Sequence, residues 1–208
     1  MDAGSHFDWT EGGPDKSVLV PAAGFLLAGG RSSRMGRDKA LLTLGGEPLV
    51  ARGIRKLGEI CAEVAIAGGD EELAKFGRVI PDKSPGCGPL GGIVSALEQS
   101  SFEWNVFLPV DAPYVPVAAL KTLLSTAAGF SGVCVMARVQ GRMQPLCAVY
   151  SKDALTVLQE ELAAGRWKVT LAIETAGAIK IVDFDDASWF ANLNTPEEFA
   201  EAEQHLKG

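Results

Sequence analysis

The stretch "GFLLAGGRSSRMGRDKALL", residues 24 to 42, joins a short apolar run to two glycines and a cluster of cations. Residues 24–28 have the length and composition of a buried strand. Gly29 and Gly30 follow directly, and glycine lets backbone N–H groups approach a ligand that a Cβ would hold away. The cations then fall within nine positions, at Arg31, Arg34, Arg37 and Lys39. A strand that ends in such a loop favours nucleotide binding.

The cations suit phosphate oxygens. In a chain with a formal net charge of −7, a bound anion must be met by a local cluster. Arg34 offers a planar guanidinium that can grip two oxygens, and Lys39 offers a compact, mobile charge. The loop is not a Walker motif, because Gly36 is not followed by Lys and then Ser or Thr. The alternative, a solvent-exposed charged turn, is disfavoured by the two adjacent glycines.

Apolar runs and helical stretches alternate beyond residue 20. Runs typical of strands lie at residues 24–28, 63–67, 77–81, 105–110, 132–139, 145–150 and 178–184. Amphipathic spacing predicts helices at residues 47–60, 89–100, 116–128, 151–165 and 195–206. Pro48 is expected in the first turn of the first helix, and Thr195 with Glu198 forms a capping box at the last. This alternation predicts an α/β fold, a three-layer α/β/α sandwich with a mostly parallel sheet that binds ligands at its carboxyl edge.

The ends of the chain bear on organisation and location. Residues 1–20 lack periodicity, which predicts a flexible leader before a single domain at residues 21–208. The N-terminus is acidic, unlike a secretory signal, and the apolar run at residues 18–28 is shorter than the roughly 20 residues that span a bilayer. The acidic balance argues against nucleic acid or a membrane as a partner. We therefore expect a cytoplasmic protein.

The four cysteines form no Cys-x-x-Cys pair, which excludes a zinc ribbon and a thioredoxin-type motif. Cys61, Cys134 and Cys147 lie among Ile, Val and Leu. They are expected to be buried free thiols, as in a reducing compartment.

A second glycine-rich motif, "PDKSPGCGPLGG", occupies residues 81–92. From Gly86 onward it fits Gly-x-Gly-x-x-Gly, and Asp111 stands twenty residues beyond the last of these glycines, as in a dinucleotide-binding dehydrogenase. Against that interpretation, residues 82–85 separate the preceding strand from Gly86, and Pro89 removes an N–H from the loop. A loop that folds over a flat base fits better.

Polar side chains also follow later strands. Asp111 ends the apolar run at residues 105–110, so its carboxylate is expected at the carboxyl edge of the sheet. Mg²⁺ is usually held by one or two carboxylates together with substrate phosphates, which makes Asp111 the candidate metal ligand; the alternative is a helix cap before Pro116. Asn192 and Asn194, in "NLNTPEE", carry amides that can contact a phosphate or a metal's outer shell. No general base is evident.

Together these motifs resemble the molybdenum cofactor guanylyltransferase (MobA) family of nucleotidyltransferases, which have a glycosyltransferase-A-like Rossmann sheet. The match covers nearly the whole chain after residue 23 and rests on "LAGGRSSRMGRDKALL", "PDKSPGCGPLGGI", "FLPVDAPYVP" and "NLNTPEE" in the family's order. The resemblance implies GTP contacts at Leu27, Ala28, Gly29, Lys39, Asp82 and Asp111. It also implies that Asp111 holds Mg²⁺, and Arg34 matches the signature arginine of the first loop.

The implied reaction is attack by the terminal phosphate of molybdopterin on the α-phosphorus of Mg-GTP, which yields the guanine dinucleotide cofactor and pyrophosphate. Arg34, Lys39 and Asp111 would be the catalytic residues. A phosphate monoester is already anionic near neutral pH, so alignment and charge stabilisation suffice without a general base. The acceptor would face Arg142, Gln144, Asn192 and Asn194. Other proteins of molybdenum cofactor biosynthesis, or acceptor proteins, are expected partners.

The chain departs from the family pattern at Ala67, where some members carry an asparagine that contacts the nucleotide. Three alternatives remain open: CMP transfer to the same pterin, nucleotidyl transfer to a sugar or alcohol phosphate, and a non-catalytic nucleotide-binding regulator. Related cytidylyl enzymes tend to have alanine at the position of Gly29, which favours a purine here. Lys39 and Asp111 argue against a non-catalytic role.

Overall fold

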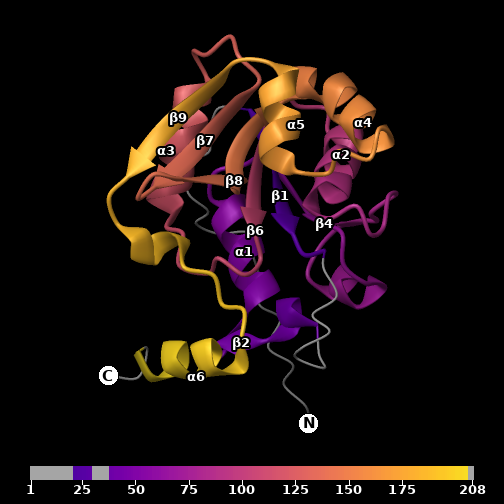
Figure 1. Cartoon of the computed structure of the whole chain (residues 1–208). Coiled ribbons are helices and arrows are strands. Elements are labelled where there is room, and N and C mark those ends of the chain that lie inside the picture. The colour runs from indigo at the N-terminus through magenta and orange to yellow at the C-terminus, as the bar shows by residue number, and fades with distance from the viewer. Residues whose placement is uncertain (1–20, 30–37, 206–208) are drawn as a thin grey trace.

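The computed structural model describes residues 21–29 and 38–205, so the leader predicted at residues 1–20 lies outside the described part. Strands and helices alternate along the chain, and most of the strands form one central sheet (Figure 1). Its strands are β1 (Ala22–Leu27), β4 (Glu63–Ala67), β5 (Val79–Ile80), β6 (Trp104–Pro109), β7 (Cys134–Val139), β8 (Arg142–Ser151) and β9 (Ile179–Phe184). The helices are α1 (Leu49–Gly58), α2 (Pro89–Gln99), α3 (Val117–Ala127), α4 (Leu155–Ala163), α5 (Val169–Ala176) and α6 (Pro196–His205).

The sheet is mostly parallel, as predicted, and each of its strands falls on a predicted apolar run. Its strand order is β5-β4-β1-β6-β8-β7-β9. All neighbours pair in parallel except β8, which is antiparallel to both β6 and β7. The reversal occurs in a two-residue turn in which Gln140 and Gly141 have φ values of +47° and +73°, the conformation that tight hairpins require. This turn also makes β8 start earlier than the predicted residue 145.

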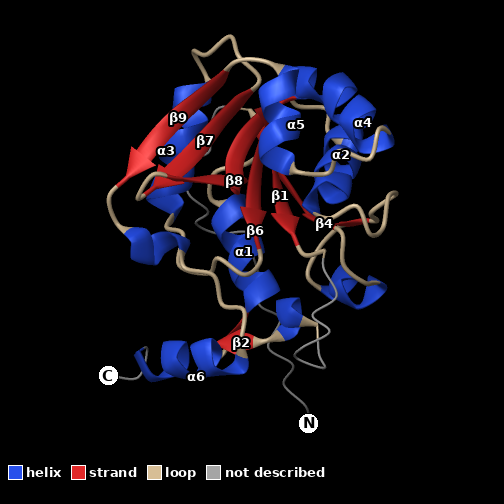
Figure 2. Cartoon of the chain, in the orientation of Figure 1, coloured by secondary structure: helices blue, strands red, loops and turns tan. Residues whose placement is uncertain are grey.

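Helices cover both faces of the sheet, which confirms the predicted three layers (Figure 2). Alternate strand residues point to opposite faces. Leu26 belongs to the core shared with α1 and α3. Phe25 and Leu27 belong to the core shared with α2, α4 and α5. Because β1 and β6 are buried on both sides, each appears in the sequence as a continuous apolar run.

A third, smaller core lies beyond the carboxyl ends of β1 and β6. There α6 packs on the hairpin of β2 (Thr43–Leu44) and β3 (Glu47–Pro48) through Leu44, Leu193 and Phe199. Figure 1 shows α6 and β2 together below the arrowheads of β1 and β6. The predicted capping box is formed, since Glu198 N–H donates to Thr195 Oγ1 and Thr195 N–H donates to Glu198 Oε2, at 3.2 and 3.1 Å.

The structure differs from the sequence expectations in three elements. Pro48 precedes α1 in an extended conformation and pairs in β3, rather than lying in the first helical turn. Helix α5 and the β2–β3 hairpin were not predicted, because both are too short to show a clear period.

Cys61, Cys134 and Cys147 are buried and free, as expected. No helix within the described ranges is long and apolar enough to cross a membrane.

Helix α1 packs closely against β1 at Gly53, so a substitution at this position tests how tight the packing between them is. A Cβ built on Gly53 would lie 2.3 Å from Leu26 Cδ1 in the filled core. We expect Gly53→Ala to lower the free energy of unfolding by about 1–3 kcal/mol, because overpacking outweighs the gain in helix propensity. Urea unfolding followed by circular dichroism measures the change.

Gly58→Ala is the matched control, because a Cβ at Gly58 in the same helix meets no atom within 4 Å. This variant should unfold at the same or a slightly higher urea concentration. Equal stability of the two variants would show that the contact between α1 and Leu26 is not tight.

Candidate functional site

Three predicted site residues from distant parts of the chain meet at the carboxyl edge of the sheet. Lys39 Nζ donates to Asp111 Oδ2 at 3.0 Å and to Asn194 Oδ1 at 2.9 Å. The Lys39 and Asp111 side chains are only 14% and 26% exposed. An ion pair that is partly shielded from water interacts more strongly than one on an open surface. We call Lys39, Asp111 and Asn194 together the cation cluster, after the one lysine ammonium on which the other two side chains converge.

Local structure presents each member of the cation cluster. Lys39 begins a 3₁₀ turn (Lys39–Leu41) that is capped by Asp38, whose Oδ1 accepts from Ala40 N–H at 2.9 Å. Asp111 lies two residues beyond the end of β6. Asn194 directly precedes the capping box of α6, and its own N–H donates to Glu198 Oε2.

Two backbone hydrogen bonds fix the position of Asp111 from opposite sides. Val110 N–H donates to Leu27 O at 3.0 Å, which ties the end of β6 to the end of β1. Leu193 N–H donates to Asp111 O at 2.8 Å, which ties the same chain to the segment before α6. The end of β1, the loop after β6 and the segment that carries Asn194 therefore form one connected unit.

The oxygens of the cation cluster suit a hard divalent metal. A carboxylate and a carboxamide oxygen already converge on one cation, the Lys39 ammonium. Within the described ranges, no group of three or more His, Cys, Asp or Glu side chains could hold a metal ion. Mg²⁺ is commonly held by one or two carboxylates plus substrate phosphates and water, so a site with Asp111 as its one carboxylate fits that ion.

A hollow of about 180 Å³ adjoins Asp111 and includes two of the predicted acceptor residues. Gln144, from β8, and Asn192 line it together with Asp111, Cys147 and Phe190. Burial raises the pKa of Cys147 to about 12, so this thiol is neutral near pH 7. Arg142 lies exposed at the start of β8, outside the lining of the hollow. The hollow therefore offers neutral amides beside the carboxylate.

The backbone of Leu27, Ala28 and Gly29 forms the other side of this edge. Ala28 N–H donates to Ala67 O at 3.0 Å, and a Cβ built on Gly68 would lie 2.9 Å from Gly29 Cα. Gly29 itself is exposed. Ala67 is 1% exposed and packs in the core under α2, so its side chain does not face a ligand.

Asp82 lies two residues beyond the end of β5. Its Oδ1 accepts from Ser84 N–H at 2.8 Å, and its carboxylate packs against α2, where a Cβ on Gly91 would lie 2.6 Å from Oδ1. Asp82 therefore shapes the 81–88 loop. Gly86 comes six residues after the last residue of β5, unlike the first glycine of a dinucleotide fingerprint.

Three of the loop cations, Arg31, Arg34 and Arg37, lie outside the described residues, as does Gly30. Of the predicted site, the structure thus brings together Lys39, Asp111 and Asn194, with Gln144 and Asn192 beside them.

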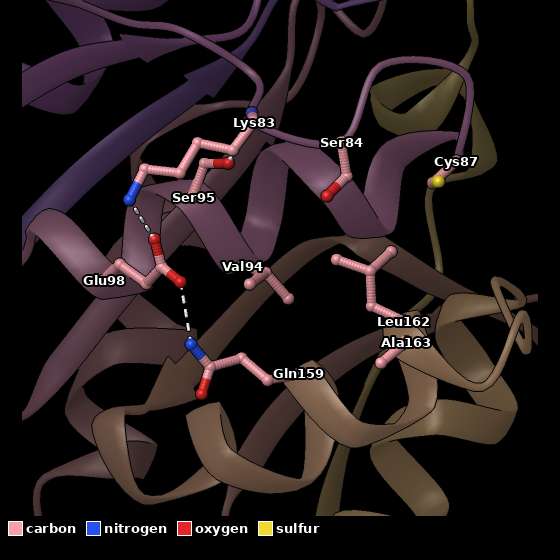
Figure 3. Close-up of a pocket in the computed structure, with 9 residues that line it drawn as sticks. All are labelled: Lys83, Ser84, Cys87, Val94, Ser95, Glu98, Gln159, Leu162 and Ala163. Carbon is pink, nitrogen blue, oxygen red and sulfur yellow. Dashed lines mark hydrogen bonds and ion pairs between the residues drawn. The ribbon is translucent and has the colours of Figure 1, made fainter.

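A second hollow, of about 210 Å³, lies behind the 81–88 loop, between α2 and α4 (Figure 3). Figure 3 shows one end closed by Glu98, which accepts from Lys83 and Gln159 at 2.5 and 2.7 Å. The pKa of Glu98 is lowered by its hydrogen bond to Lys83. Ser84 and Cys87 line the opposite end. This hollow shares the loop of Asp82 but none of the residues of the cation cluster.

Lys56 of α1 is a residue that the sequence motifs did not reveal. Its Nζ donates to Pro113 O and to Val115 O, both at 2.6 Å, in the loop that begins with Asp111. Burial lowers the pKa of Lys56 to about 8, and the positive charges of Arg52 and Arg55 add to the effect. A signal was present, because Lys56 falls on the buried stripe of α1, with Leu49, Val50, Gly53 and Leu57.

Comparison with known proteins shows which family the chain resembles. The MobA-like NTP transferase domain model matches residues 24–176. The chain is 37% identical over 191 residues to a molybdenum cofactor guanylyltransferase of Cereibacter sphaeroides, an alignment that covers 88% of this chain and 96% of that protein. It is 35% identical over 181 residues to one of Vibrio cholerae, covering 85% and 88% of the two chains.

Solved structures share the fold at lower identity. Molybdopterin-guanine dinucleotide biosynthesis protein A of Archaeoglobus fulgidus matches with a TM-score of 0.76 at 23% identity, covering 89% of this chain and 98% of that one. The 2-C-methyl-D-erythritol 4-phosphate cytidylyltransferase of Thermus thermophilus matches with a TM-score of 0.66 at 14% identity, covering 91% and 100%. These findings overturn the dehydrogenase alternative, and this chain belongs to the MobA-like NTP transferase family of nucleotidyltransferases.

Proposed function

We propose that this chain transfers GMP from Mg-GTP to the terminal phosphate of molybdopterin cofactor and releases pyrophosphate. The observation that carries the proposal is the meeting of Lys39, Asp111 and Asn194 at the carboxyl edge of the sheet, in a member of this family. An oxygen of the acceptor phosphate forms a bond to the α-phosphorus of GTP. The bond between that phosphorus and the pyrophosphate oxygen breaks.

Asp111 would hold the Mg²⁺ ion, with Asn194 beside it. When bound, this ion would neutralise charge on the phosphate oxygens and the leaving group. The Lys39 ammonium, which now donates to Asp111 and Asn194, can donate to phosphate oxygens instead and stabilise charge that develops on pyrophosphate. Arg34, in the preceding loop, is assigned the same role from its place in the family motif.

The remaining predicted residues would orient the two substrates. The backbone of Leu27 to Gly29 would contact the base, and the loop shaped by Asp82 would cover it. Gln144 and Asn192, which line the hollow beside Asp111, would bind the acceptor, with Arg142 at its outer edge. The acceptor phosphate is already anionic near neutral pH, so the site can work by alignment and charge stabilisation alone. We place the reaction in the cytoplasm, where other proteins of the same cofactor's synthesis are expected partners.

The choice of nucleotide is tested by incubating the protein with Mg²⁺, molybdopterin-containing cofactor and GTP, CTP, ATP or UTP in turn. Mass analysis should find the guanine dinucleotide product with GTP, together with released pyrophosphate. Turnover with CTP alone would contradict the proposed substrate. Nucleotide binding without any pyrophosphate release would favour the non-catalytic alternative.

Asp111→Asn tests the metal ligand. We expect turnover to fall by on the order of 100-fold or more, since the charge that holds the metal at the reacting phosphate is lost. Steady-state pyrophosphate release measures the loss, and circular dichroism should show an unchanged fold. Asp183→Asn is the matched control, because it also loses an ion pair, to Arg138, but lies on β9 in an exposed position. Wild-type turnover in Asp111→Asn would exclude this residue as the metal ligand.

Lys39→Met tests both roles of the lysine. We expect a loss of about 2–4 kcal/mol of transition-state stabilisation, by analogy with removal of one charge-stabilising donor. Without nucleotide, the variant should bind Mn²⁺ about two- to fivefold more tightly, because the ammonium no longer competes for the Asp111 and Asn194 oxygens. Electron paramagnetic resonance of free Mn²⁺ measures this affinity.

The matched control for Lys39→Met is Lys75→Met, which breaks a surface ion pair with Glu72. It should leave both turnover and Mn²⁺ affinity at wild-type values. A Lys39→Met protein with weaker Mn²⁺ binding would show that the lysine does not compete with the metal.

A further inference from the structure

Lys56 is buried where a charged side chain is energetically unfavourable. The residue is 9% exposed, and among the lysines within the described ranges it alone falls in the buried class. Desolvation opposes its charge, as do Arg52 and Arg55 on the same helix, while Glu47 and Glu59 offset part of the effect. Cys147 faces it from β8 as a neutral thiol. An apolar side chain of similar length would fill this space without the desolvation penalty.

The two hydrogen bonds of Lys56 both end on the loop between β6 and α3. Its Nζ donates to Pro113 O and Val115 O, each at 2.6 Å. The loop's own backbone bonds are longer, with Ala112 N–H to Pro109 O at 3.2 Å and Val115 N–H to Ala112 O at 3.4 Å. Pro113 and Pro116 have no N–H to donate. The ammonium therefore adds two short hydrogen bonds to the apolar packing that joins this loop to α1.

The same loop begins with Asp111. Its carboxylate is reached from the opposite direction by Lys39, and its carbonyl oxygen by Leu193 N–H. Neither contact restrains the residues after Asp111, whereas Lys56 holds the carbonyls two and four positions further along. Ala112 and Val115 pack in the core, so loss of that tie would loosen the turn rather than release it, and the carboxylate could then rotate away from a bound metal.

We propose that Lys56 is a positioning residue for the metal-binding loop, its ammonium fixing the turn from Asp111 to Val115 through the two carbonyl oxygens. This inference rests on the proposed function only in taking Asp111 as the metal ligand. Groups that orient metal ligands from behind typically change metal affinity by about 10–100-fold when removed. That effect appears in metal binding itself and does not depend on which reaction follows.

The test measures Mn²⁺ affinity in the presence of GTP by electron paramagnetic resonance, without acceptor. Lys56→Met should weaken Mn²⁺ binding by about tenfold. Lys56→Arg, which keeps the charge and several donors, should recover most of that loss. In steady-state turnover the Mg²⁺ concentration for half-maximal rate should rise for Lys56→Met, while the rate at saturating Mg²⁺ falls less.

Lys152→Met is a close control. Lys152 Nζ likewise donates to two backbone carbonyl oxygens, of Leu97 and Ser100, but it follows β8 at the opposite edge of the sheet. Its removal should lower thermal stability without changing Mn²⁺ affinity. If Lys56→Met and Lys152→Met lose stability alike and both bind Mn²⁺ as the wild type does, Lys56 is only structural and the proposal is overturned.

Failure of the proposed function gives a different result. Suppose that the wild-type protein makes no guanine dinucleotide product but that Lys56→Met still weakens Mn²⁺ binding. This result would contradict the proposed reaction and support the positioning role. An Mn²⁺ affinity that does not change in Asp111→Asn would overturn the positioning role, because the loop would then hold no metal.

Discussion

The parallel pairing of β1 with β6 sets Leu27 beside Pro109, and the geometry of the site depends on it. Where the pairing ends, Val110 N–H still donates to Leu27 O, so the two loops that follow leave the sheet from one point. One loop carries the glycines and Lys39, and the other carries Asp111. Side chains 72 positions apart in sequence are thus brought to 3.0 Å. Parallel strands achieve this because their carboxyl ends share one edge.

The ion pair of Lys39 and Asp111 shows how one cation of the first loop is balanced in an acidic chain. The lysine is balanced by Asp111 and donates to Asn194 as well. The oxygens that hold it are those proposed to hold the metal, so the ammonium and the metal would compete for them. If Asp111 holds the metal as proposed, the lysine would become available to phosphate. A site built this way is poised for a nucleotide that arrives with its metal.

The sequence predicted the sheet well and its accessories less well, for physical reasons. Strands buried on both faces are continuous apolar runs, so β1, β4 and β6 and the polar residues at their ends could be recognised. Helix α5 spans only Val169–Ala176 and contains β-branched residues, and β2 and β3 are two residues each. Their structure is decided by tertiary packing rather than by period. Lys56 was missed because its place on the buried stripe of α1 indicates that it is buried but not which carbonyls on a distant loop it contacts.

Asp82 and Asp111 show why position at a strand end does not decide chemistry. Both follow strands of the same sheet, yet Asp82 accepts from Ser84 N–H within its own loop and packs against α2. Its hydrogen bond is part of the fold, and moving the carboxylate would break the loop. Asp111 is instead satisfied by the side chain of Lys39, a partner that can leave without disturbing any backbone bond. An exchangeable partner, on a loop to which Lys56 donates two hydrogen bonds, is why we propose Asp111 rather than Asp82 as the metal ligand.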